Sequence, residues 1–133
     1  MIMVDVDDFK SLNDRLGHAA GDELLRRIAM LMNDAIRESD LLARYGGDEF
    51  VVLASDTDLA GAEQLAEKIR TAVAESSFIV DESRRPIRTT LSMGIAQYAG
   101  TRKRFFAATD SALYRAKAQG KNCVAVADED EVL

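Results

Sequence analysis

The stretch that decides the fold is "RYGGDEF", residues 44–50. It lies between two apolar runs, "LLA" at 41–43 and "VVLA" at 51–54. A glycine pair between two apolar runs is typical of a tight β-hairpin, so we expect strands on both sides of Gly46 and Gly47. Asp48 and Glu49 then place two carboxylates at the hairpin tip, where they repel each other unless a cation compensates them.

The segments around the hairpin predict a sheet covered by helices. Residues 1–6 are typical of a buried strand, and residues 22–36 and 58–76 repeat apolar residues at helical spacing. The stretch 77–98 predicts strand, turn and strand, with a proline in the polar turn. Residues 104–118 predict a helix, and "NCVAVA" at 122–127 predicts a last strand. The order β-α-β-β-α-β-β-α-β favours an α/β fold with mostly antiparallel strand pairs.

Length and composition limit the class of protein. The chain has 133 residues, typical of one domain, and a net charge of −6, which argues against non-specific binding of nucleic acid. No apolar run approaches the roughly 20 residues that cross a bilayer, so we expect no direct membrane insertion. A single cysteine, Cys123, cannot form an internal disulfide, and we interpret it as a core residue. A reducing cytoplasm is the expected location.

Both ends of the chain carry expectations of their own. "MIMVDV" enters a strand without a polar lead-in, which suggests that an N-terminal piece is missing. "DEDEVL", residues 128–133, is expected to be a frayed, solvated acidic tail, which leaves residues 1–127 as the domain.

Acids gather at two predicted strand ends. Alternation places Asp5 and Asp7 on the same side of the first strand, and they converge with Asp48 and Glu49 if that strand lies beside the hairpin. Mg²⁺ would relieve the repulsion, because it takes one or two carboxylates and completes its shell with phosphates and water. Spacing alone leaves an alternative open, in which these acids are turn formers and solvated strand ends.

Two further groups suit an anionic ligand. "GHAAGDE", residues 17–23, places small residues around His18 just before a predicted helix, whose first N–H groups favour anions. A structural or solvent-facing His18 is the alternative. Lys117 and Lys121 form a positive face at the end of a predicted helix, where the alternative role is to complement the helix macrodipole.

Four segments, taken in order, resemble the GGDEF domain of diguanylate cyclases. They are "DVDDFKSLNDRLGHAAGDELL", "RESDLLARYGGDEFVVL", "TTLSMGIA" and "DSALYRAKAQGKN", and the resemblance runs from Met1 to about Val126. It implies an α/β fold (an α+β sandwich) similar to the nucleotidyl cyclase and polymerase palm, with a central, mostly antiparallel sheet surrounded by helices.

The resemblance also implies an activity. A diguanylate cyclase is a nucleotidyltransferase that condenses two GTP molecules into cyclic di-GMP and releases two pyrophosphates. Each domain binds one GTP, so the expected catalytic unit is a homodimer. Mg²⁺ is the implied cofactor, with Mn²⁺ as a substitute.

Roles for single residues follow from the same resemblance. The implied metal ligands are Asp5, the carbonyl of Val6, Asp48 and Glu49. Two of them, Asp48 and Glu49, are also the implied catalytic acids. Asp48 is the implied acceptor of the 3′-hydroxyl proton. The implied substrate-binding residues are Phe9, Lys10, Asn13, His18, Asp22, Gly46, Gly47, Lys117 and Lys121, of which Asn13 and Asp22 read guanine. Arg37 and Asp40 match an RxxD inhibitory site for the product. Lys121 stands where many members have arginine, which keeps the charge but loses the bidentate fork.

The chain departs from the family pattern at its start. Family members usually begin with a helix and a "D-x-LTGLxNRR"-like segment, and most carry an upstream sensory or receiver domain. Because these are absent, we interpret the chain as an excised output module. The rival hypothesis is a catalytically silent module that acts as a receptor for cyclic di-GMP or GTP, and a dimerisation or scaffold element is a third. Retention of both signature acids favours the enzyme.

Overall fold

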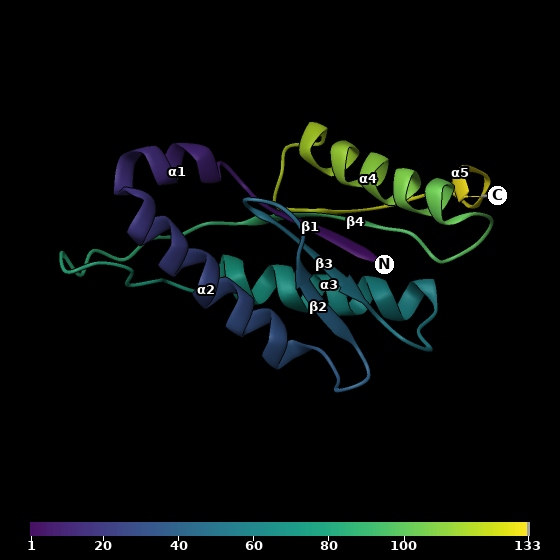
Figure 1. The fold of residues 1–133 in the computed structure, drawn as a ribbon, viewed down its shortest axis with the longest axis horizontal. Helices are drawn as coiled ribbons and strands as arrows, with labels where there is room; N and C mark the ends of the chain where they lie inside the picture. The colour runs from purple at the N-terminus through teal and green to yellow at the C-terminus, as the bar shows by residue number, and fades with distance from the viewer. Residues whose placement is uncertain (133) are drawn as a thin grey trace.

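Residues 1–132, described by a computed structural model, form a five-stranded sheet with helices on both faces (Figure 1). In chain order the elements are β1 (Ile2–Val6), α1 (Phe9–Leu16), α2 (His18–Ala35), β2 (Leu41–Arg44), β3 (Glu49–Leu53), α3 (Leu59–Ala74), β4 (Leu91–Ile95), α4 (Arg102–Ala118), β5 (Val124–Val126) and α5 (Glu129–Val132). Among these described residues, no helix is both long enough and apolar enough to cross a membrane.

The sheet has the order β2-β3-β1-β4-β5. The pairs β2–β3, β3–β1 and β1–β4 are antiparallel, and β4–β5 is parallel. The expected α/β fold with a mostly antiparallel sheet is confirmed. Because β1 lies between β3 and β4, the end of β1 is next to the hairpin tip, with Asp5 opposite Glu49 in the strand register.

The two faces of the sheet are packed differently. Helices α2 and α3 cover one face and α4 the other, as Figure 1 shows. The α2–α3 side carries a core of large apolar residues, which includes Ile2, Val4, Val52, Leu91 and Ile95 from the strands and Leu24, Ile28, Met32, Ile69 and Val73 from the helices. Burial of so much branched apolar surface is the main stabilising contribution.

Helix α4 lies unusually close to the sheet. Its contact layer consists of small residues, namely Ala96, Ala108, Ala112, Ala116, Ala125 and Ala127. At Gly94 on β4, an added Cβ would lie 2.2 Å from the backbone N of Leu113 and 2.6 Å from the carbonyl oxygen of Thr109. Only glycine permits this approach, which sets the height of α4 above the sheet.

The sequence reading was wrong about the start of the first predicted helix. That helix begins at His18 rather than Asp22, and a separate helix, α1, precedes it. Gly17, with φ of 91°, separates the two. The first turn of α2 is "HAAG", whose small side chains show no apolar stripe. In α1 a stripe was available, since Phe9, Leu12 and Leu16 recur at helical spacing.

Two other expectations also fail. The strand predicted before Pro86 is reduced to a single bridge between Phe78 and Ile87, because the exposed residues 81–86 between them form a wide turn. The acidic tail is not frayed over its described part: it forms α5, which buries Val132 against the alanine layer and pairs Glu131 with Arg115 at 3.1 Å. Leu133 lies outside the described residues.

Candidate active site at the hairpin edge of the sheet

The hairpin turn is held by the arginine that precedes it. Arg44 donates from Nε to the carbonyl of Gly46 at 3.2 Å and from Nη2 to the carbonyl of Gly47 at 2.6 Å. The backbone N–H of Tyr45 donates to the carbonyl of Glu49 at 2.8 Å. These contacts fix the turn that carries Asp48, so Arg44 supports the tip structurally.

Asp5 and Asp48 meet where β1 ends beside the turn. The Val6 N–H donates to the Asp48 carbonyl at 3.2 Å, which holds the end of β1 against the tip. Asp5 is only 7% exposed. Burial raises the pKa of Asp5 to about 6, with Lys117 acting in the opposite direction and the neighbouring Asp48 adding to the rise. The structure therefore brings these two predicted metal ligands together in a site that disfavours negative charge.

Lys117 supplies the local counter-charge. Its Nζ forms an ion pair with Oδ2 of Asp5. The other oxygen, Asp5 Oδ1, is buried and has no hydrogen-bond partner among the described residues. An orphaned carboxylate oxygen costs free energy, and a cation is the partner that such an oxygen most readily accepts.

The acids fit a divalent cation only in part. Among residues 1–132, no three acidic, histidine or cysteine side chains are grouped closely enough to hold a metal ion by themselves. The Glu49 carboxylate is turned towards Gly46, where an added Cβ would lie 3.5 Å from Glu49 Oε2. The orphaned Asp5 oxygen beside Asp48 nevertheless suits Mg²⁺, which takes one or two carboxylates and draws its other ligands from phosphates and water.

Asp7 does not contribute a free carboxylate to this group. It accepts hydrogen bonds from the hydroxyls of Thr90 at 2.6 Å and Ser92 at 2.5 Å, and from the Asn122 N–H at 3.0 Å. These bonds tie the end of β1 to β4 and to the loop after α4. Asp7 was predicted to converge with the other acids. Its carboxylate oxygens are already hydrogen-bonded to Thr90, Ser92 and Asn122, so it offers no free oxygen to a cation.

Lys121 lies in that same loop. Its Nζ pairs with Asp8 at 2.5 Å, and both residues have left-handed backbone, with φ of 65° and 55°. Asn122, with φ of 47°, continues the strained segment. Such strain persists only where surrounding bonds hold it, and here Asp7 and Asp8 do so. Lys117 on the last turn of α4 and Lys121 in the loop after it thus pair with different acids.

A second predicted group lies on α1 and α2. The side chains of Asn13 and His18 approach at 2.9 Å between Nδ2 and Nδ1. Gly21 permits the packing of Asn13, because an added Cβ would lie 2.1 Å from Asn13 Oδ1. Asp22 is exposed one turn after His18. The structure brings Asn13 and His18 together and places Asp22 on the adjacent helical turn.

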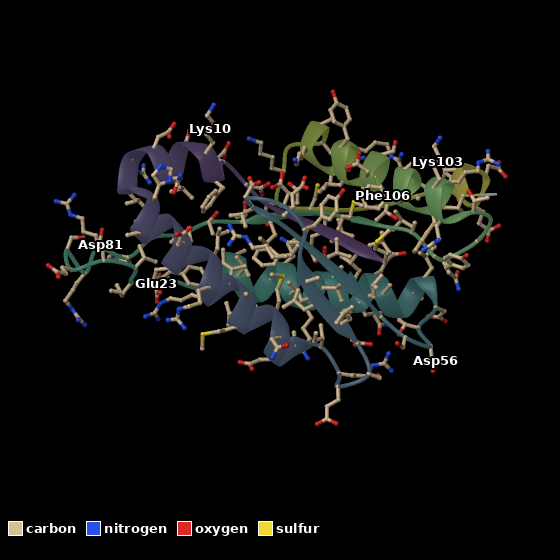
Figure 2. The ribbon with its side chains drawn as sticks, in the orientation of Figure 1. Lys10, Glu23, Asp56, Asp81, Lys103 and Phe106 are labelled. Atoms are coloured by element: carbon tan, nitrogen blue, oxygen red, sulfur yellow. The ribbon has the colours of Figure 1, made fainter. Side chains whose placement is uncertain are left out.

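Phe9 and Lys10, two other predicted substrate-binding residues, lie on α1 and differ in exposure. Phe9 packs against the main core, so its first role is structural. Lys10 is exposed on the first turn of α1, where Figure 2 shows it pointing away from the sheet. A cavity of about 810 Å³ lies at the other end of β1 and is lined by Met1, Leu53, Leu59, Tyr98, Phe105 and neighbours.

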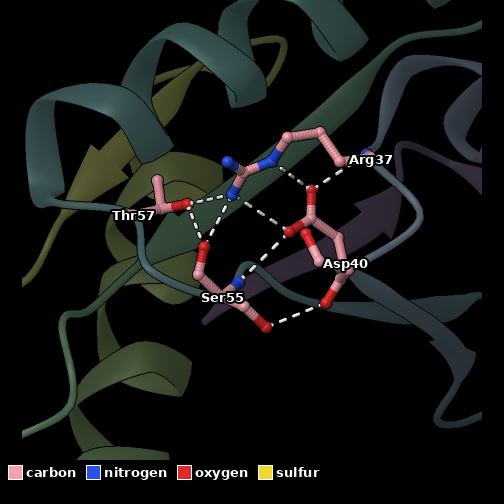
Figure 3. A network of polar contacts seen from close by, with 5 residues as sticks. Arg37, Asp40, Ser55 and Thr57 are labelled. Carbon is pink, nitrogen blue, oxygen red and sulfur yellow. Dashed lines mark hydrogen bonds and ion pairs between the residues drawn. The ribbon is translucent and has the colours of Figure 1, made fainter.

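Arg37 and Asp40 form a separate network beside the end of β2 and β3 that lies away from the hairpin tip (Figure 3). Asp40 accepts from the Arg37 backbone N–H at 3.0 Å and from the Ser55 N–H at 3.1 Å. Arg37 Nη2 donates to the Ser55 carbonyl and to Oγ1 of Thr57, each at 2.6 Å. This network cross-links the two loops and lines a hollow of about 590 Å³ shared with Lys68 on α3.

The family model for the diguanylate cyclase GGDEF domain matches residues 1–123. The chain belongs to the GGDEF domain family. The match includes every acid and cation described above except those of the tail.

Two curated relatives show the degree of similarity. The response regulator PleD of Caulobacter vibrioides is 42% identical over 126 residues, which is 92% of this chain and 28% of PleD. Diguanylate cyclase A of Treponema denticola is 39% identical over 127 residues, which is 93% of this chain and 34% of that protein. The chain therefore spans about a third or less of these relatives.

Solved GGDEF domains share the fold. The GGDEF domain of TpbB (YfiN) from Pseudomonas aeruginosa superposes with a TM-score of 0.91 at 38% identity, covering 98% of this chain and 77% of that one. The GGDEF domain of DgcB from Caulobacter crescentus, solved in complex with c-di-GMP, has a TM-score of 0.89 at 27% identity, covering 94% of this chain and 75% of that one.

Proposed function

We propose that this domain is a Mg²⁺-dependent diguanylate cyclase that condenses two GTP molecules into cyclic di-GMP. The observation that carries the proposal is the buried Asp5 with its orphaned oxygen, held next to Asp48 at the tip of an intact GGDEF signature. Membership of the GGDEF family supports the same activity.

The proposed reaction is a nucleotidyl transfer between two bound GTP molecules. Each 3′-oxygen forms a bond to the α-phosphorus of the opposing GTP, the bond from that phosphorus to the bridging oxygen breaks, and pyrophosphate leaves. Asp48 takes the 3′-hydroxyl proton. A bound Mg²⁺ would lower the pKa of the attacking hydroxyl and offset the charge of the phosphates. Asp5, the Val6 carbonyl, Asp48 and Glu49 would hold it.

The remaining residues would position the nucleotide. Asn13, set against Gly21 and bonded to His18, would donate to the O6 or N7 edge of guanine, and Asp22 would accept from N1–H and the 2-amino group. Adenine offers Asp22 the wrong pattern, which would favour GTP over ATP. Lys117, Lys121 and the exposed Lys10 would meet the phosphates.

Incubation with GTP and Mg²⁺, followed by chromatography of the nucleotides, tests the activity. We expect cyclic di-GMP from the wild-type chain in a full-length or artificially dimerised form, and a loss of at least about a hundredfold in Asp48→Asn and Asp5→Asn. Absence of product from a dimerised wild-type form would favour the silent receptor module instead, which binding of cyclic di-GMP or GTP without turnover would then identify.

Arg37 and Asp40 are also proposed to bind the product and inhibit the enzyme. A guanidinium can stack on guanine and grip its edge. Because Arg37 already bonds Ser55 and Thr57, a ligand there would also affect the loop that joins β3 to α3. The rates of the wild type and of Arg37→Ala are each expressed relative to the rate without cyclic di-GMP. Arg37→Ala should need a higher concentration of cyclic di-GMP for half-inhibition. An unchanged half-inhibitory concentration would reject the assignment.

A further inference from the structure

Lys117 pairs with one oxygen of Asp5, the carboxylate that is proposed to bind a cation. It projects from the last turn of α4, and its side chain is 37% exposed while that of Asp5 is 10% exposed. Its Nζ contacts Oδ2 of Asp5, whereas Oδ1 of the same carboxylate has no hydrogen-bond partner among residues 1–132. One oxygen of Asp5 is thus compensated by the chain itself and the other is not.

Lys117 is the cation that the chain itself supplies to this site. Asp48 lies beside Asp5, because the Val6 N–H donates to the Asp48 carbonyl at 3.2 Å, so two acids share one ammonium group. That single positive charge cannot compensate both carboxylates, which leaves room for a divalent cation.

The packing of α4 allows Lys117 to leave without moving its helix. Gly94 and the alanine layer hold α4 close to the sheet, so the Lys117 backbone is fixed beside the site. Its four-carbon side chain is flexible and can swing towards solvent. Lys121 differs, because its partner is Asp8 and its left-handed backbone is held by the Asp7 and Asp8 contacts.

We propose that Lys117 is a resident counter-ion that pairs with Asp5 in the nucleotide-free domain, opposes a cation on the same carboxylate, and moves to the phosphates when a metal–triphosphate binds. The inference rests on the metal site of the proposed function and adds a competition within it. A metal ion on the free oxygen Oδ1 would share the Asp5 carboxylate with the Lys117 ammonium group, and the two positive charges repel each other. A triphosphate gives Lys117 a new partner, so metal and nucleotide bind with positive cooperativity.

Mn²⁺ binding to the nucleotide-free chain, followed by electron paramagnetic resonance, tests this competition. Lys117→Met removes the charge while keeping a long side chain, and we expect it to tighten Mn²⁺ binding roughly three- to tenfold, the range of a partly exposed ion pair. Lys103→Met is the control: it removes the same charge from an exposed position at the other end of α4 and should change Mn²⁺ affinity less than about twofold. Lys117→Gln is a second neutral variant if Lys117→Met does not fold.

A titration with 3′-deoxy-GTP, which cannot cyclise, tests the coupling. The nucleotide should strengthen Mn²⁺ binding in the wild-type chain, and it should do so less in Lys117→Met. Unchanged or weaker Mn²⁺ binding in both neutral Lys117 variants would overturn the inference. Asp5→Asn distinguishes failure of the proposed metal site from failure of the counter-ion role. If Asp5→Asn leaves Mn²⁺ binding intact, the metal site itself is wrong. If Asp5→Asn loses Mn²⁺ binding but the Lys117 variants bind as the wild type does, only the counter-ion role is refuted.

Discussion

Asp5 is the residue on which the candidate site depends most. Asp5 is only 7% exposed, and burial raises the pKa of its carboxylate to about 6, so the carboxylate is costly to ionise. Because its pKa in the folded domain lies above the unfolded value, the cost of its charge is present above about pH 6 and disappears as the carboxylate gains its proton towards pH 4. A bound cation removes the same cost at neutral pH.

Metal affinity should consequently depend on pH. We expect Mn²⁺ binding to weaken as the pH falls through about 6, because protons then compete for Asp5. Titrations of the nucleotide-free chain between about pH 5 and pH 8 measure this, given the ordinary range of carboxylates. Asp5→Asn should abolish the step, and Asp34→Asn, on the exposed side of α2, should retain it. A step that persists in Asp5→Asn would contradict the assignment.

Asp40 shows the opposite shift at the residue scale. Burial alone raises its pKa, but hydrogen bonds from the Arg37 backbone and side chain and from the Ser55 N–H outweigh burial and hold the pKa of Asp40 below its usual value. Its side chain is 1% exposed. A lowered pKa means that Asp40 stabilises the fold above the unfolded value of about 4, and that this contribution is lost as the pH falls through the folded pKa.

Asp40→Asn should therefore destabilise the domain at neutral pH by about 1–3 kcal/mol, as expected for loss of hydrogen bonds to a charged group. Urea unfolding measures the difference in the free energy of unfolding. We expect the difference to shrink below roughly pH 4, where the wild-type carboxylate begins to lose its advantage. A difference that is the same at acid and neutral pH would show that charge is not the cause.

At the scale of elements, the close packing of α4 positions the cation. The distance between α4 and the sheet is set by Gly94 and the alanine layer, and this approach lets Lys117 reach Asp5. Larger residues in this layer would raise the helix. The loop after α4 is fixed independently, through the bonds that Asp7 accepts from β4 and from Asn122.

Gly94→Ala should force α4 away from β4, because the new Cβ would lie 2.2 Å from the Leu113 backbone N. We expect a loss of about 1–3 kcal/mol in the free energy of unfolding, typical of overpacking, measured in urea. Gly47→Ala is the control for stability, since an added Cβ there has no atom within 4 Å. Equal stabilities of the two variants would show that the contact layer adapts.

At the scale of the whole molecule, one domain offers one set of acids. Each domain contributes a single hairpin tip, one Asp5 and one Asp48 on the same sheet edge. The proposed product joins two nucleotides symmetrically, so two domains must face each other. Lys10 and Asp22, two of the residues proposed to bind the nucleotide, are exposed, which is compatible with a second domain bringing its own nucleotide.

Activity should accordingly rise faster than linearly with protein concentration. Specific activity of the isolated domain, measured across a dilution series, is expected to increase with concentration, and fusion to a dimeric coiled coil should remove the dependence by raising the effective concentration. An equal mixture of the wild type and Asp48→Asn should fall below half of the wild-type rate, since mixed pairs lack one functional site. A specific activity independent of dilution in the unfused domain would contradict the need for a weak dimer.

The sequence by itself determined the class of fold and the family. The Gly-Gly hairpin, the helical stripes of residues 22–36 and 58–76 and the acids of the signature are local patterns, and local patterns can be read without coordinates. Where side chains are small the pattern disappears, which is why the start of α2 was predicted wrongly. The strand predicted before Pro86 had an apolar pattern, but it is reduced to a single bridge at Phe78 by the wide turn that follows. The prediction of a frayed tail failed for another reason, because Val132 is buried by residues far from it in the sequence.

Tertiary structure alone decided which acid is free and which is engaged. Asp5 and Asp7 look alike in "DVDD", yet one keeps an orphaned oxygen and the other is saturated by Thr90, Ser92 and Asn122. Lys117 and Lys121 look alike at the end of one helix, yet they pair with different acids. Hydrogen bonds and ion pairs act over a few ångströms, and partners 80 or more residues away along the chain become neighbours only when the chain is folded.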